Sequence, residues 1–225
     1  MTLTEYPDLE QRSEEWFAAR CGLVTASMVG KLITPTLKVA DNDTSRGILT
    51  TLAAERLTGH IEETPMTRDM ERGVFEEPFA RDYYVENYAP VKEVGFMVRA
   101  FGNGVRIGCS PDGLVGDDGG IEIKSRRQKK HVVTVLSGQV PTENMAQCQT
   151  FLLVTGREWI DYCSFSGGMH FWTKRVFPDP QWQDVVLAAA TTAEDAIANI
   201  VHRYTVATNG LPVTERILDL DELVI

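Results

Sequence analysis

The chain has 225 residues, of which 24% are charged and 43% are hydrophobic, and this composition is ordinary for a folded protein. Its length favours one α/β domain spanning residues 1–225, with a helical N-terminal portion and a C-terminal helix and tail. We expect no membrane role, because no apolar run is long enough to cross a bilayer. The polar stretch 1–11 lacks the features of a signal peptide, so a cytoplasmic location is expected.

The formal net charge of −10 argues against a protein that coats DNA, because phosphate binding requires clustered lysine and arginine. The basic run from Lys124 to Lys130 supplies local positive charge, although such a run is also typical of a solvated loop. The cysteines are far apart without a Cys-x-x-Cys pair, and the histidines lack metal-ligand spacing. Reduced core thiols are therefore favoured, and no histidine is assigned a catalytic role.

Helices are predicted in the first ninety residues. Ser13 precedes two acidic residues and an apolar stretch, which is typical of a capped helix that Arg20 closes. The further helices expected from apolar spacing are 25–30, 43–57, which Gly59 ends, and 68–88, which Pro78 interrupts or restarts.

Strands are predicted after Pro90. The segments 91–99, 105–109, 114–115 and 121–124 form a β-meander in this prediction, with a turn at 117–120. A helix from 141 to 156, strands at 159–165 and 170–177 and a long helix from 179 to about 204 follow. Residues 211–225 alternate acidic with apolar side chains, and this end either packs on a neighbour or remains loose.

Two short segments of the meander carry the chemistry. Alternation along a strand places Glu122 and Lys124 on one face and points Ile123 into the core. Asp112, at the end of the preceding strand, then meets Glu122 across the hairpin. Two carboxylates at this junction suit magnesium, with the backbone carbonyl of Ile123 as a further ligand. Manganese is the candidate substitute.

This arrangement suits phosphodiester hydrolysis. A metal can activate water and neutralise a phosphate, and Lys124 can orient water and offset developing charge. A plainer interpretation stays open, since Asp-Gly is common turn chemistry and Glu-Ile-Lys occurs in ordinary exposed strands. On their own, these residues do not decide between the two interpretations.

Further segments accompany this pattern, in chain order: Trp16–Ser27, Gly73–Glu77, Ser110–Gly113, Glu122–Lys124 and Met145–Gln149. Together they resemble the phage lambda exonuclease and YqaJ-like viral recombinase family, over the chain from Trp16 to about Gly156. The resemblance implies a nuclease of the PD-(D/E)xK type. It also implies a restriction-endonuclease-like α/β core, with a mixed central β-sheet flanked by helices.

The resemblance assigns the active-site residues. Asp112 and Glu122 match the family's metal-binding acids, and Lys124 matches its catalytic lysine. Glu77 matches an acid that a helix contributes to the metal site. Its neighbour Glu76 is a rival, although the four-residue step from Gly73 favours Glu77.

Other positions of the family match polar residues outside the strand motif. Gln147 matches a glutamine that faces the active site from a helix, with Gln149 as the less favoured choice. Arg20, Ser27 and Ser110 match positions that grip the terminal 5′ phosphate, which a guanidinium fork and hydroxyl donors suit.

The chain departs from the family after the motif lysine, where Ser125-Arg126 replaces the family's cysteine-proline. The basic residues that follow are therefore assigned to DNA with less precision. Arg126, Arg127 and Lys130 are the expected contacts, with Lys129 as an alternative.

The activity that this resemblance implies is a magnesium-dependent 5′-to-3′ exonuclease on double-stranded DNA ends. It releases 5′ mononucleotides and leaves a 3′ single-stranded overhang for phage-type recombination. A ring-shaped homotrimer threading DNA, a single-strand annealing partner and a phage or prophage origin in a bacterial host are implied as well. Two alternatives stay open: an endonuclease on the same core, and a catalytically inactive scaffold that binds DNA ends.

Overall fold

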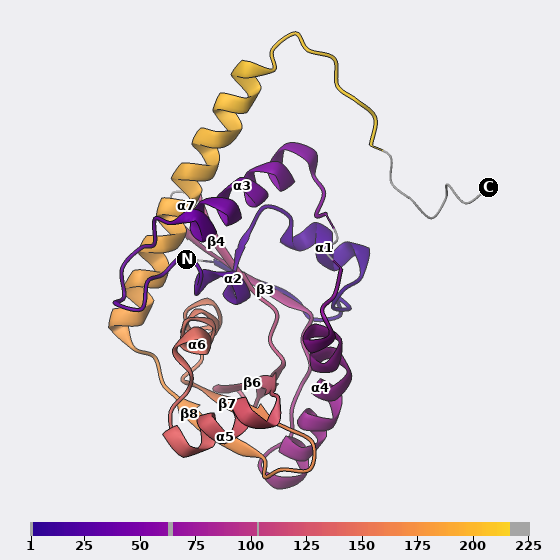
Figure 1. Cartoon of the computed structure of the whole chain (residues 1–225), viewed down its shortest axis with the longest axis vertical. Helices are drawn as coiled ribbons and strands as arrows, with labels where there is room; N and C mark the ends of the chain where they lie inside the picture. Colours follow the sequence, from indigo (N-terminus) through magenta and orange to yellow (C-terminus); the bar gives the residue numbers. More distant parts are fainter. Residues whose placement is uncertain (1, 63–64, 103, 217–225) are drawn as a thin grey trace, which may run out of the picture.

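A computed structural model describes residues 2–62, 65–102 and 104–216 (Figure 1). Its strands are β1 (Thr2–Tyr6), β2 (Val24–Thr25), β3 (Phe96–Gly102), β4 (Val105–Cys109), β5 (Gly113–Val115), β6 (Gly119–Ser125), β7 (Trp159–Phe165) and β8 (Trp172–Val176). Its helices are α1 (Glu14–Arg20), α2 (Ala26–Val29), α3 (Asp43–Thr58), α4 (Arg68–Asn87), α5 (Gln128–Ser137), α6 (Thr142–Thr155) and α7 (Pro180–Ala207). This mixed α/β architecture is the predicted fold class.

The strands form two four-stranded sheets, in the orders β1-β3-β4-β2 and β5-β6-β7-β8. Each is mixed, because β2 is parallel to β4 and β6 is parallel to β7. The predicted meander is therefore divided, with the β3–β4 hairpin in one sheet and the β5–β6 hairpin in the other. Pro111, between β4 and β5, has no amide proton to continue a ladder, which explains why the strands separate there.

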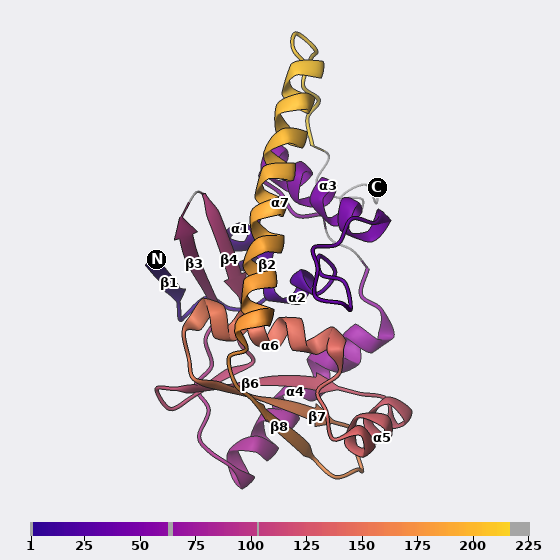
Figure 2. The ribbon, with the colours of Figure 1, turned by 90° about the vertical axis from the view of Figure 1, so that its left-hand side faces the viewer.

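The sheet β5-β6-β7-β8 lies between α4 and α6 (Figure 2). Ile123 packs in a cluster with side chains of α4, as the sequence predicts. On the other face Gly120 touches α6, where an added Cβ would come within 2.3 Å of the Phe151 ring. Because side chains alternate along a strand, Glu122 and Lys124 share the face of Gly120. The predicted active-site residues therefore face α6.

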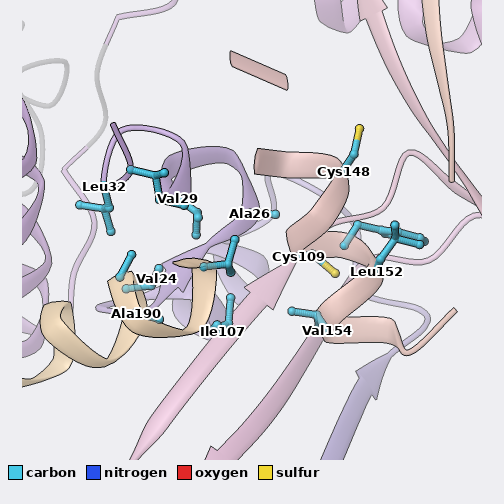
Figure 3. Packing of buried hydrophobic residues seen from close by; sticks show 14 of the residues in the cluster. Val24, Ala26, Val29, Leu32, Ile107, Cys109, Cys148, Leu152, Val154 and Ala190 are labelled. Atoms are coloured by element: carbon cyan, nitrogen blue, oxygen red, sulfur yellow. The ribbon is translucent and has the colours of Figure 1, made fainter. Parts of the chain in front are cut away.

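The largest hydrophobic cluster joins both sheets to α2, α3, α6 and α7. Figure 3 shows the part of it where β2, β4, α2, α6 and α7 meet. All four cysteines are free thiols, three of them buried and Cys21 half-buried, as the sequence favours. None of the helices in the described ranges is long and apolar enough to cross a membrane.

Helix α4 is continuous from Arg68 to Asn87 and contains Pro78, so the predicted break is wrong. Proline removes one hydrogen bond and crowds the preceding turn. Thr67 caps the helix, and Ala80 and Tyr84 are fully buried beyond the proline. The capped start and the buried end hold the helix together across Pro78.

Three elements are absent from the sequence-based prediction, and one of them is the two-residue strand β2, which lies at the predicted start of a helix and pairs with β4. Strand β1 pairs antiparallel with β3 at a sheet edge, and its side chains are almost all exposed, so no alternating pattern reveals it. Helix α5 occupies much of the basic run, where a loop was expected. It buries His131 and Thr134 and exposes most of its apolar residues, so it lacks an apolar stripe facing the core.

The C-terminal helix is confirmed as α7, whose first turn is capped by Asp179. Of the predicted tail, residues 211–216 form neither helix nor strand and are exposed. The remaining residues, 217–225, lie outside the described part of the chain.

Candidate active site

A single pocket of about 880 Å³ gathers residues from seven parts of the chain. It is lined by α1 and the turn before it, the start of α2, residues 70–81 of α4, residues 93–95 before β3, the β4–β5 connection, β6 and α6. Seven of the residues singled out from the sequence lie in it: Arg20, Ser27, Glu77, Ser110, Asp112, Lys124 and Gln147. The fold thus brings together residues that are up to 127 positions apart, from Arg20 to Gln147.

Asp112 is fixed against strand β6. Its carboxylate accepts a hydrogen bond from the backbone N–H of Ile123 at 2.6 Å, so the contact across the hairpin is with the amide next to Glu122 rather than with the predicted Glu122 side chain. Glu122 is the residue before Ile123 on β6 and is only 3% exposed. It therefore lies beneath the pocket rather than lining it. Burial raises the pKa of both carboxyls, that of Glu122 to about 8.

Lys124 forms an ion pair with Glu122, in which Nζ lies 2.5 Å from Oε1. The contact lacks hydrogen-bond geometry, and Oε1 has no hydrogen-bond partner among the described residues. Burial alone would lower the pKa of Lys124, but the carboxylates of Glu122 and Asp112 raise it overall. The lysine therefore stays charged at the pocket floor.

Glu77, rather than Glu76, reaches the pocket from α4. Burial and the nearby Asp112 raise the pKa of Glu77 to about 7. Glu76 accepts a hydrogen bond from Ser125 and lies 3.8 Å from Arg72, which holds it away from the pocket. The two adjacent glutamates thus point in different directions from α4 and have different roles.

Arg81 is a pocket residue that the sequence reasoning missed. Its guanidinium donates to the backbone oxygen of Asp112 at 2.9 Å and forms ion pairs with Glu77 at 2.5 Å and Glu93 at 2.9 Å. It therefore ties α4 to the β4–β5 connection. The four-residue step from Glu77 to Arg81, which favours a helical ion pair, was the signal that could have found it.

The structure also separates Gln147 from Gln149 on α6. Gln147 is half-buried and lines the pocket. Gln149 is buried, where it donates to the Phe177 oxygen at 2.8 Å and accepts from the Asp179 amide at 2.9 Å. Gln149 therefore holds the chain that leads into α7, and Gln147 is the glutamine of the site.

Arg20 and Ser110 form a joint polar group on one side of the pocket. Ser110 Oγ accepts hydrogen bonds from Arg20 at 3.3 Å and from Trp16 Nε1 at 2.9 Å. The guanidinium lies 3.9 Å above the Trp16 ring, and burial lowers the pKa of Arg20 to about 10. Because Ser110 uses its oxygen as the acceptor in both bonds, its proton can be donated to a bound phosphate.

Ser27 lies on α2 at the same side of the pocket, with its hydroxyl 3.2 Å from that of Thr25. Trp16 contacts both Arg20 and Ser110, a role that the sequence did not predict. Its contact with Ser110 joins residues 94 positions apart, so no local pattern reveals it.

The three basic residues assigned to DNA from the run after Lys124 do not reach the pocket. Arg126 bonds to Asn144 and to the Tyr162 hydroxyl at 3.0 Å, and its side chain is 12% exposed. Arg127 and Lys130 are 67% and 68% exposed and pair with acidic neighbours. The start of α5 at Gln128 turns the chain away from the pocket. Arg126 is thus built into the fold, and a DNA role for the other two stays a prediction.

The acids fit a magnesium ion. In the part of the chain that the structure describes, no three His, Cys, Asp or Glu side chains form a metal-binding group. Magnesium, however, is usually held by one or two carboxylates and several waters. Asp112 and Glu122 offer two desolvated carboxyls, one with a buried oxygen that lacks a hydrogen-bond partner among those residues. A cation would stabilise this set, whereas the carbonyl of Ile123 as a ligand stays a prediction.

Similar solved structures define the class of protein. The chain is 31% identical, with a TM-score of 0.77, to an alkaline exonuclease, LHK-Exo, from Laribacter hongkongensis, over 89% of this chain and 100% of that one. The same similarity holds for LHK-Exo in complex with dAMP. A phage related exonuclease from Haemophilus somnus 129PT shares the fold at 14% identity, with a TM-score of 0.56, over 81% of this chain and 96% of that one. The fold is that of a nuclease.

The family follows from the sequence match. Residues 15–158, more than half of the chain, match the family model of the YqaJ-like viral recombinase domain. The chain belongs to this family, as the sequence segments indicate. A search of the curated proteins gave no match.

Proposed function

We propose that the protein is a magnesium-dependent exonuclease that digests one strand of duplex DNA from its 5′ end. The observation that carries the proposal is the shared pocket, in which the acids and Lys124 lie beside the Arg20–Ser110 group. A phosphate held at that group would place the next phosphodiester near the acids. Cleavage there releases one 5′ mononucleotide and leaves a 3′ overhang.

The residues divide the work between binding and chemistry. Arg20, Ser27 and Ser110 bind the terminal phosphate through charge-assisted and hydroxyl hydrogen bonds. Asp112 and Glu122 hold the magnesium ion, which when bound supplies Lewis acidity and an activated water. Lys124 offsets the charge that develops on the phosphate. Glu77 of α4 and Gln147 of α6, which both line the pocket, orient the water.

The size of the pocket and the similar enzyme support a mononucleotide product. A volume of about 880 Å³ lies within the range of pockets that hold small ligands. LHK-Exo was solved in complex with dAMP, a deoxynucleoside monophosphate. The proposal extends to a ring-shaped homotrimer and to a single-strand annealing protein that receives the 3′ overhang.

The test uses linear duplex DNA labelled separately at each end, with and without magnesium, beside covalently closed circular duplex. The proposal expects mononucleotides from the 5′ end of the linear DNA, only with magnesium, and intact circles. Cleavage of the circles would instead identify an endonuclease. Binding of linear ends without hydrolysis, in magnesium or manganese, would identify an inactive end-binding scaffold.

A further inference from the structure

The turn before α1 forms one wall of the pocket. Residues 7–12 all line it. The Ser13 amide donates to the Glu10 oxygen at 3.2 Å and closes the turn, and the Gln11 side chain donates to the Pro111 oxygen at 3.3 Å. An added Cβ at Gly95 would overlap the Leu9 oxygen at 1.8 Å, so the turn packs tightly. The turn is therefore held in a fixed position beside the Ser110–Asp112 segment.

Arg12 occupies an unfavourable backbone conformation in this turn. It is the third residue of the turn and has a φ of 75°, a left-handed value for which glycine is preferred. Among the described non-glycine residues, Leu37 alone shares a positive φ. Strained residues concentrate at functional sites, where the side chain justifies the conformation. The turn therefore carries an arginine at a position where its backbone conformation favours glycine.

The charge of Arg12 is available to a ligand. Four cationic side chains line the pocket: Arg81 and Lys124 pair with carboxylates, and Arg20 is bound to a serine hydroxyl. Arg12 is exposed, and its side-chain hydrogen bond goes to the sulfur of Met66 at 2.8 Å. Within the described ranges no carboxylate lies within ion-pair distance of it. A thioether is a weak acceptor, so most donors of the guanidinium can bind an anion.

The position of Arg12 relative to Arg20 indicates which anion. Helix α1 lies between the two, with Arg12 in the turn before it and Arg20 at its end, and its seven residues correspond to about 10 Å along the helix axis. One DNA strand carries a phosphate about every 3.4 Å of axis, so this distance spans roughly three nucleotides. We propose that Arg12 binds a backbone phosphate a few nucleotides inside the duplex end whose terminal phosphate Arg20 holds. The proposal rests on the proposed function, since Arg20 defines where the end lies.

The test measures binding of a fluorescent 5′-phosphorylated linear duplex by anisotropy across a salt series, without divalent cations. Arg12→Gly removes the charge and relieves the backbone, so thermal stability should be equal or higher. Binding should weaken about tenfold, and the slope of log K against log salt should fall by about 1. Arg12→Lys should keep most of that slope. Arg203→Ala, which removes an exposed arginine near the end of α7, should match the wild type.

Wild-type affinity and salt slope in Arg12→Gly would overturn the inference. A loss of stability in Arg12→Gly, with equal losses of binding in Arg12→Lys, would also overturn it by assigning a structural role. Both outcomes leave the proposed function standing, provided that the wild type still digests linear duplex from its 5′ end. Failure of the wild type to bind or digest that duplex would instead remove the proposed function.

Discussion

At the scale of single residues, Lys124 lines the pocket and forms an ion pair with Glu122, which is buried beneath it. Removing a charged pair from water costs free energy, which good geometry and further hydrogen bonds must offset. The amide of Ile123, which lies between Glu122 and Lys124 on β6, donates to the Asp112 carboxylate. The three residues therefore act as one unit, and changes to them should affect chemistry before binding.

We predict that Asp112→Asn, Glu122→Gln and Lys124→Met each reduce cleavage at least about 100-fold, because they remove charge while keeping volume. Duplex binding and the cooperative unfolding transition should persist. Rates are measured on labelled linear duplex with magnesium. Near-normal hydrolysis by any two of the purified variants contradicts the site assignment.

Arg20→Ala should slow digestion of 5′-phosphorylated ends much more than that of 5′-hydroxyl ends, because the lost contact is a charge-assisted bond to the phosphate. The ratio of the two rates is the measurement. Cys21→Ala changes the neighbouring half-buried side chain and serves as the matched control. Equal slowing of both substrates would show that Arg20 instead maintains the packing against Trp16.

The choice between two candidate residues that are close in the sequence requires the structure. The positions of Glu122 and Lys124 on one face of β6 follow from alternation along the strand, and the structure shows them paired there. Gln147 and Gln149 are two residues apart on one helix, and only the position of the segment before α7 shows that Gln149 is used structurally. Arg81 was missed because two of its three partners, Asp112 and Glu93, lie in connections distant from it in the sequence.

At the scale of elements, the connection from β6 to α5 gives the basic residues between Lys124 and Lys130 different roles. Arg126 joins this connection to α6 and β7 through Asn144 and Tyr162. Its charge therefore contributes to packing, whereas Lys130 on the outer face of α5 is exposed.

We predict that Arg126→Ala lowers the free energy of unfolding by about 1–3 kcal/mol, because it leaves buried acceptors unpaired. Lys130→Ala should change it by less than about 0.5 kcal/mol, as is usual for a surface residue. Urea unfolding at equilibrium compares the two. Equal stability of the two variants would contradict the structural role given to Arg126.

The helices and strands with clear periodicity could be predicted, and those without it could not. Helix α6 and strand β7 have apolar spacing and flanking glycines or turns, and both are found near their predicted bounds. Strand β1 lies at an edge with exposed side chains, and α5 has few buried residues. The division into two sheets falls between β4 and β5, where Pro111 lies, and hydropathy gives no indication of which strands pair.

At the scale of the whole molecule, the net charge of −10 raises the problem of how an acidic nuclease stays on DNA. A monomer should be repelled at long range, since its basic residues are outnumbered. The ring proposed for this protein would repeat the exposed Lys129 and Lys130 around one channel through cyclic symmetry. Arg126 cannot contribute, because it is bound internally.

The ring predicts a stable oligomer without DNA in sedimentation velocity at micromolar concentration. Lys129→Glu together with Lys130→Glu should then reduce digestion while the oligomer persists, because the change lies in the channel rather than between subunits. Digestion already begun should continue after excess unlabelled duplex is added. A monomer in sedimentation, with arrest by competitor DNA, would leave a distributive nuclease with the same pocket.

Helix α7 extends beyond the rest of the described fold (Figures 1 and 2). Its 28 residues correspond to about 42 Å, yet its buried side chains all lie between Val185 and Ile197, and residues 202–207 are exposed. The two ends of α7 should therefore open independently. Amides near Val185 should exchange with deuterium only on global unfolding, whereas those of 202–207 should exchange when the helix end frays. Peptide-resolved exchange measures this difference. Uniform protection to Ala207 in the DNA-free protein would show that another surface covers the end of the helix.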